Sequence, residues 1–226
     1  MRVAFLLFPS VTQLDLTGPA QVLARLGGDA RVDLVWKTRD PVPTDAGFSI
    51  LPTATFDEVP AADILCVPGG IGVNDVIADD EAMAWVRAIG GQATWVTSVC
   101  TGSLILGGAG LLKGYRATSH WAWRDMLTLF GATPVAARVV VDRNRVTGGG
   151  VTAGIDFALT LTALIRGEEH ARMVQLSLEY DPAPPFDAGS PERAGEALVG
   201  AFEARMAKLA PGREQAFRDA AAKRGF

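Results

Sequence analysis

A cysteine at a predicted strand-to-helix turn is the residue of this sequence best placed for chemistry. Cys100 follows the β-branched, apolar segment Thr94–Val99, which is typical of a strand, and precedes a predicted helix over Thr101–Gly107. Such a turn holds a nucleophile above the edge of a sheet, and the positive end of the helix favours the thiolate. The alternative interpretation is a buried cysteine that only fills space.

Asp15 is the second candidate, because Leu14 and Leu16 flank its carboxyl group. A carboxyl group in apolar surroundings has a raised pKa and can transfer a proton near neutral pH. The alternative is an aspartate that caps a helix, since Gly18-Pro19 opens a predicted helix that has Thr17 as a plausible cap.

Glycines near these residues allow the backbone to approach a substrate closely. Gly69 and Gly70 follow a further buried-type strand, and Gly148–Ala153 leads from a hairpin arm into a helix. Backbone amides at such turns can stabilise a developing negative charge beside a thiolate. The predicted amide donors are Gly70, Ile71, Thr101 and Val151, with Gly69 and Gly102 as supporting glycines.

Histidine and cofactor motifs are weak in this sequence. His120 is either a base for Cys100 or a structural histidine, and its separation from His170 argues against a metal site. Gly148–Ala153 matches the Gly-x-Gly-x-x-Ala dinucleotide pattern, but no acidic residue ends a following strand about 20 residues on. Cys66 is expected to fill space in a strand. We therefore expect neither a metal nor an organic cofactor.

The composition favours a single compact enzyme-sized domain, with or without an appendage. The chain has 226 residues, of which 49% are hydrophobic and 20% charged, and its net charge of −4 argues against nucleic acid as a partner. Two cysteines fit a reducing compartment, and the N-terminal residues do not fit a signal peptide, so we expect a cytoplasmic protein. No apolar segment approaches the roughly 20 residues of a membrane helix.

Strand-like and helix-like segments alternate along the chain, which predicts a parallel sheet covered on both faces. In such sheets, function lies at the carboxyl ends of the strands, where Asp15, Gly70 and Cys100 are all expected. The predicted strands are Val3–Phe8, Val32–Trp36, Asp63–Val67 and Thr94–Val99, with a hairpin over Arg138–Thr147. The predicted helices include Glu81–Ile89, Ala153–Ile165 and Glu168–Leu178, and an extended Asp181–Ser190 leads to a helical tail at Ala194–Ala222.

Several motifs together resemble the isocyanide hydratases, which belong to the ThiJ/PfpI branch of the class I glutamine amidotransferase-like superfamily. The motifs are Gln13–Pro19, Val67–Gly70, Ser98–Ser103, Arg116–Trp121, Thr147–Asp156 and Pro182–Ser190. The resemblance covers residues 1–191. It implies a flavodoxin-like three-layer α/β/α sandwich with a mostly parallel central sheet, and a homodimer. The expected domain spans residues 1–190, and a C-terminal helical extension spans 191–226.

The resemblance also implies a hydro-lyase reaction on an isocyanide, with Cys100 as nucleophile and Asp15 as its acid and base. Thr101 is implied to contribute a hydroxyl group and an amide. Attack on the isocyanide carbon gives a thioimidate, and water then releases an N-substituted formamide. Protease-like relatives place a histidine directly after the cysteine, where this chain has Thr101, so peptidase and glutaminase activities are not expected.

Three other functions remain open from the residues. A ligand-sensing domain of the arabinose-regulator type would add a basic DNA-binding domain of roughly 100 residues, whereas residues 191–226 carry seven basic and five acidic side chains. A glyoxalase- or deglycase-like enzyme would pair its cysteine with a glutamate from the first loop, where this chain has Asp15. A redox sensor would use oxidation of Cys100.

Overall fold

The computed structural model describes residues 1–226 and contains a seven-stranded sheet of order β10-β11-β7-β6-β1-β2-β5. Every neighbouring pair is parallel except the β10–β11 hairpin. The strands are β1 Arg2–Leu6, β2 Arg31–Trp36, β5 Ala54–Thr55, β6 Ile64–Val67, β7 Trp95–Val99, β10 Val139–Asp142 and β11 Arg145–Gly148. Two small sheets pair β3 Val42–Pro43 with β4 Ser49–Ile50, and β8 Arg116–Ala117 with β9 Thr133–Pro134.

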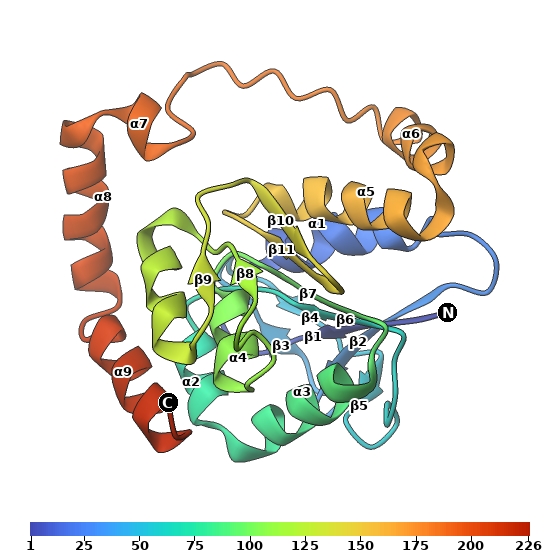
Figure 1. The fold of residues 1–226 in the computed structure, drawn as a ribbon, viewed down its shortest axis with the longest axis horizontal. Helices are drawn as coiled ribbons and strands as arrows, with labels where there is room; N and C mark the ends of the chain where they lie inside the picture. The colour runs from blue at the N-terminus through green and yellow to red at the C-terminus, as the bar shows by residue number, and fades with distance from the viewer.

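Helices cover both faces of the sheet, which makes three layers (Figure 1). One face carries α1 Gln13–Leu23 and α5 Ala153–Arg166, with α6 Glu168–Ser177 packed on α5. The other face carries α2 Val73–Ala78, α3 Asp80–Gln92 and α4 Gly102–Gly108, and the 3₁₀ helix η1 Trp121–Phe130 packs on α4. The predicted flavodoxin-like α/β sandwich is confirmed. The central strands read as continuous apolar segments because helices bury both of their faces.

The first helix begins earlier than its sequence signals suggest. The helix α1 starts at Gln13, after an extended Thr12, so the expected cap Thr17 lies inside it and donates its hydroxyl to the Gln13 carbonyl. Asp15 therefore lies in the first turn of α1, and its side chain is not the cap. The proline-and-glycine signal at Gly18-Pro19 marks a close approach to α5 instead: a Cβ atom on Gly154 would lie 3.0 Å from the Pro19 ring.

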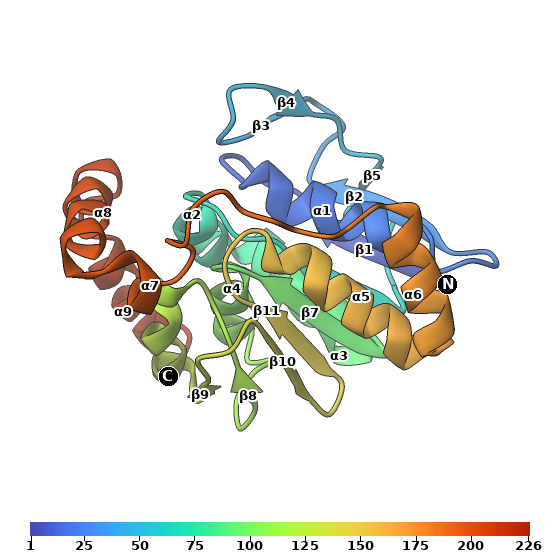
Figure 2. The same ribbon diagram turned by 90° about the horizontal axis from the view of Figure 1, so that it is seen from above.

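The C-terminal residues pass from α6 through an extended segment to the opposite side of the molecule, where α9 Arg213–Lys223 packs on α2 and η1. An extended segment runs from α6 across the molecule to α7 Pro191–Ala194, and α8 Glu196–Leu209 and α9 follow (Figure 2). The predicted helical tail is interrupted between α8 and α9, because Pro211 removes a donor and Gly212 adopts a left-handed φ of 72°. No residue of α8 is buried, whereas Phe217 of α9 is fully buried beside η1.

The boundary between the expected domain, residues 1–190, and the C-terminal extension, residues 191–226, stays a prediction. None of the helices is long and apolar enough to cross a membrane.

Candidate active site

The parallel strands bring the predicted residues to one edge of the sheet. Asp15 follows β1, Gly69 follows β6, Cys100 follows β7, and the glycine turn Gly148–Gly150 ends β11. A cavity of about 190 Å³ lies at this edge beside the Cys100 thiol. The cavity is lined by Thr12, Gly70, Ile71, Cys100, Thr101, His120, Trp123, Val151, Phe202, Met206 and Arg213.

Cys100 is held at the turn in a strained conformation. Its φ is 55°, which is uncommon for a residue with a side chain. The Cys100 N–H donates to the Gly149 carbonyl over 2.7 Å, and the Cys100 carbonyl accepts from the hydroxyls of Ser119 at 2.9 Å and Ser103 at 3.2 Å. These bonds hold the strained backbone in place and fix the thiol over the carboxyl edge of the sheet. Strained residues at functional sites persist only where the surrounding structure holds them in this way. Ser119 was not identified from the sequence, because its partner is a backbone atom that no motif reveals.

Glycine is needed at two positions around this turn. A Cβ atom on Gly102 would lie 2.1 Å from the Val67 carbonyl, and one on Gly69 would lie 2.6 Å from the Thr101 nitrogen. Contacts below 3.0 Å with backbone atoms cannot be relieved by a rotamer change. These glycines therefore let the β6 and β7 turns touch, which brings the nucleophile beside Asp15.

Asp15 is fully buried and lies within hydrogen-bonding reach of the Cys100 thiol. Its Oδ2 accepts from the Gly69 N–H at 2.9 Å, while its Oδ1 has no hydrogen-bond partner. Burial raises the pKa of Asp15 to about 7, although the bonds from Gly69 and Cys100 lower it in part. The apolar setting predicted for this carboxyl group is confirmed, and its pKa suits proton transfer at neutral pH.

The resting state of Cys100 differs from the thiolate expected at a helix terminus. Burial and the neighbouring Asp15 carboxylate hold the pKa of Cys100 well above its usual range, although the Thr101 amide and Arg213 lower it. Burial is the largest of these effects, so it outweighs the donors beside the sulfur. The expectation of a resting thiolate is therefore wrong. The thiol donates its proton towards Asp15, and the two groups form a coupled pair.

The backbone donors have different partners. The Gly70 N–H donates to the Thr101 hydroxyl at 3.2 Å, while the Thr101 N–H points at the Cys100 sulfur. Ile71 and Val151 border the cavity, and their N–H groups donate to no protein atom. Of the predicted anion-stabilising amides, that of Gly70 is thus already engaged.

His120 borders the cavity but is a poor base. Burial and the nearby Arg213 lower the pKa of His120 to about 4, so the ring is neutral at pH 7. Its Nδ1 accepts from the Ala122 N–H at 3.3 Å, which caps η1, and its ring stacks on Phe202.

Cys66 is buried in β6 away from the cavity, and burial raises its pKa to about 12. No group of three or more His, Cys, Asp or Glu side chains is placed to hold a metal ion.

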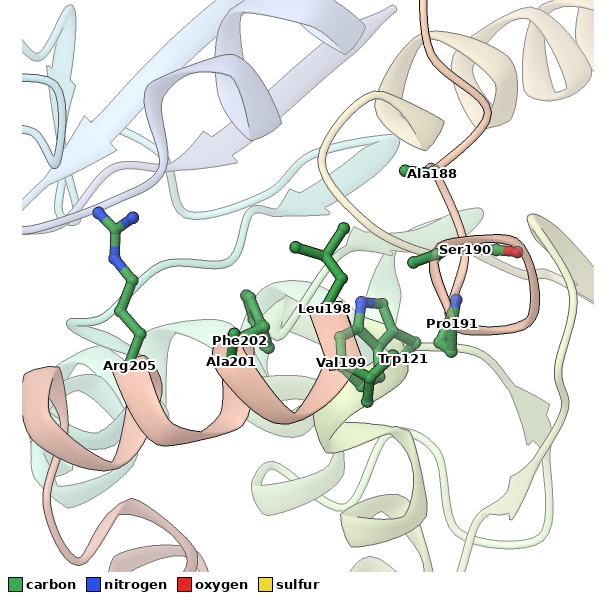
Figure 3. A pocket seen from close by; sticks show the side chains of 11 residues that line it. Trp121, Ala188, Ser190, Pro191, Leu198, Val199, Ala201, Phe202 and Arg205 are labelled. Carbon is green, nitrogen blue, oxygen red and sulfur yellow. The ribbon is translucent and has the colours of Figure 1, made fainter. Parts of the chain in front are cut away.

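Three cavity residues come from the C-terminal extension and were missed at the sequence level. Phe202 and Met206 of α8 form part of the wall, and Arg213 begins α9. Phe202 and Trp121 also border a second cavity of about 390 Å³ between α8 and residues 188–191 (Figure 3). Phe202 therefore borders both the Cys100 cavity and this outer cavity.

Comparison with known proteins identifies the family. The DJ-1/PfpI family model matches residues 1–164 of the chain. The chain belongs to the DJ-1/PfpI family. Within this family it is 52% identical over 223 residues to an isonitrile hydratase of Pseudomonas putida, and the match covers 99% of this chain and 97% of that protein.

Two further similarities agree with the fold. The crystal structure of a ThiJ/PfpI family protein from Pseudomonas syringae has a TM-score of 0.92 at 45% identity, and the match covers all of this chain and 90% of that one. The HTH-type transcriptional regulator GbdR of Pseudomonas aeruginosa is 32% identical over 185 residues, which are 78% of this chain and 48% of that protein. The predicted resemblance to ThiJ/PfpI proteins is confirmed.

Proposed function

We propose that this DJ-1/PfpI protein adds water to isocyanides and releases N-substituted formamides. The observation that carries the proposal is the buried thiol–carboxyl pair of Cys100 and Asp15 beside a small cavity. The 52% identity to the Pseudomonas putida isonitrile hydratase, over nearly the full length of both chains, supports the same reaction.

In the first step the Cys100 sulfur bonds to the terminal carbon of the isocyanide, R–N≡C. The thiol proton passes to the Asp15 carboxylate and from there to the same carbon. The S–C and C–H bonds thus form on one atom, and the product is a thioimidate, R–N=CH–S–Cys100. Asp15 is a carboxylate before and after this step. Its pKa of about 7 lets it accept and return the proton with little energetic penalty.

In the second step water attacks the thioimidate carbon. Asp15 accepts a proton from the water and returns it to the nitrogen, which gives R–NH–CH(OH)–S–Cys100. The C–S bond then breaks, and the hydroxyl proton passes through Asp15 to the sulfur. The formamide R–NH–CHO leaves, and the Cys100 thiol is restored. One isocyanide and one water are consumed for each formamide.

The surrounding donors stabilise the charge that forms as the thiol proton leaves. The Thr101 N–H points at the sulfur, and its hydroxyl keeps the Gly70 turn in place. The unpaired amides of Ile71 and Val151 are available to the substrate carbon and nitrogen. Preorganised amides of this kind stabilise developing charge without reorganising during the reaction.

The cavity favours an apolar R group of limited size. Trp123, Val151, Phe202 and Met206 supply most of the apolar wall, and the volume is about 190 Å³. A compact alkyl or monocyclic group fits such a space, whereas a larger group needs the Phe202 side chain to move.

The direct test is a hydration assay with purified protein and cyclohexyl isocyanide, with formamide measured by mass spectrometry. We expect Cys100→Ala to lose turnover. The matched control is Cys66→Ala, which removes a buried thiol outside the cavity and should keep most of the activity. The proposal fails if wild-type protein makes no formamide, or if Cys100→Ala still makes it at a substantial rate.

We also propose that the protein acts as a cytoplasmic homodimer without a nucleic-acid partner. Met173 and Leu176 of α6 and Leu164 of α5 are exposed apolar side chains on packed helices, which supports a protein contact on that side. The net charge of −4 supports the absence of nucleic-acid binding. A monomer in analytical ultracentrifugation would contradict the dimer, and salt-sensitive duplex binding at sub-micromolar protein would contradict the second point.

A further inference from the structure

The C-terminal extension delivers a buried guanidinium group to the Cys100 cavity. Arg213, the first residue of α9, is only 6% exposed and borders the same cavity as Cys100 and Thr101. One of its terminal nitrogens donates to the Gly70 carbonyl at 2.6 Å and to the Thr101 hydroxyl at 3.4 Å. Arg213 therefore contacts both residues that frame the thiol.

This arginine differs from the other basic residues of α9. Arg218 pairs with Glu214 and Lys223 pairs with Asp80, whereas Arg213 forms no salt bridge. Its guanidinium lies 5.0 Å from the Trp123 ring, and its Nε has no hydrogen-bond partner. A buried charge without a carboxylate partner is costly unless it serves a specific purpose. The anion that can form in this cavity is the Cys100 thiolate.

We propose that Arg213 is a positioning residue of the Cys100 centre. It fixes the Gly70 carbonyl and the Thr101 hydroxyl, and it places a positive charge beside the sulfur from which the proton leaves. The C-terminal extension would thereby complete the active site, because Arg213 of α9 contacts the turns that follow β6 and β7. This inference deepens the proposed hydration and rests on it for its catalytic meaning, but its effect on the thiol can be measured separately.

The geometry of Gly70 explains why the turn needs this support. Gly70 has a φ of 145°, and a Cβ atom there would lie 2.5 Å from the Ser10 carbonyl, so only glycine fits. A glycine loses more conformational freedom on folding than any other residue type does, so a glycine turn needs bonds that hold it. The bond from Arg213 to the Gly70 carbonyl restrains this peptide, and with it the Thr101 hydroxyl that accepts from the Gly70 N–H.

The charge effect is tested by the pH dependence of Cys100 alkylation with iodoacetamide, followed by peptide mapping. The ionisable groups facing the thiol are Asp15, His120 and Arg213, and the first two remain in every variant. We expect Arg213→Met and Arg213→Gln to move the alkylation profile to higher pH, which slows alkylation at pH 8 on the order of tenfold. Arg213→Lys, which keeps the charge, should restore most of the profile.

The matched control is Arg218→Met, which removes an exposed arginine from the same helix and should leave the profile unchanged. If Arg213 had only a structural role, all three Arg213 variants would change in thermal stability, and Arg213→Lys and Arg213→Gln would have the same alkylation profile. The proposal is overturned if the Gln and Lys variants share the wild-type profile, or if Arg213→Lys behaves like Arg213→Gln. If Arg213→Met does not fold, the comparison of Gln with Lys decides the question.

The hydration assay separates this inference from the proposed function. If wild-type protein hydrates isocyanides, the neutral variants should lose kcat by about tenfold or more while Arg213→Lys keeps most of it. If wild-type protein does not hydrate them, the proposed function fails, and the alkylation profiles still show whether Arg213 controls the thiol.

Discussion

Removing the negative charge of Asp15 should slow catalysis strongly and stabilise the fold at the same time. In Asp15→Asn the amide oxygen can still accept from the Gly69 N–H, so the local packing is retained. The substitution deletes the proton carrier of both steps, which costs on the order of 100-fold or more in turnover. It also removes a carboxylate that is 0% exposed and must ionise inside the protein at alkaline pH.

The stability effect follows from the pKa. The pKa of folded Asp15 is about 7, above its ordinary value of 3.8, so the folded state binds this proton more tightly than the unfolded state does. Its burial carries no ionisation penalty below pH 3.8, and the penalty is fully developed above pH 7. The difference between the two pKa values corresponds to about 4 kcal/mol of unfolding free energy as an upper value. After local relaxation, we expect the Asn variant to gain stability on the order of 1–2 kcal/mol.

The measurement is thermal unfolding of wild type and Asp15→Asn at pH 4 and pH 8. For a chain of this length we expect the variant to melt roughly 2–8 °C higher at pH 8 and close to wild type at pH 4. The control is Asp57→Asn, which removes an exposed loop carboxylate and should change neither melting temperature. The reasoning is refuted if Asp15→Asn keeps normal turnover, or if it destabilises the protein equally at both pH values.

Three further outcomes follow from the site. His120→Ala should keep clear activity, because a ring with a pKa of about 4 cannot act as the base at pH 7; an inactive but folded variant would favour a Cys–His mechanism. The pH profile of kcat/KM should rise through about pH 7 as Asp15 ionises and should not fall up to pH 9, because the pKa of Cys100 is held well above its usual range. Phe202→Ala should join the inner and outer cavities and raise the preference for bulky aryl over methyl isocyanide on the order of tenfold, which competition assays measure.

The parallel sheet and the Cys100–Asp15 pair were predictable because the alternation of strands and helices and the strand-to-helix turns are local in sequence. Apolar segments alternate with helical ones, and in a parallel sheet their carboxyl ends meet, which places Asp15 beside Cys100. The start of α1 was harder to predict, because Gly18-Pro19 resembles a helix start while α1 begins at Gln13.

The contributions of the C-terminal extension could not be derived in the same way. Arg213 reaches Gly70 across 143 residues of sequence, and no periodicity records that contact. The raised pKa of Cys100 could not be predicted either. It is caused mainly by burial, to which residues of α8 and α9 that line the cavity contribute.

The central claim is that the isocyanide becomes covalently attached to Cys100 through a proton carried by Asp15. It is tested most directly by the intact mass of the protein, quenched in acid shortly after mixing with cyclohexyl isocyanide. For wild type we expect a mass increase of one isocyanide that maps to Cys100, decays as formamide appears, and is absent from Cys100→Ala. Asp15→Asn should either show no adduct or keep it without releasing formamide. Formamide formation by wild type with no adduct at any time, or rapid turnover of the adduct in Asp15→Asn, would contradict the mechanism.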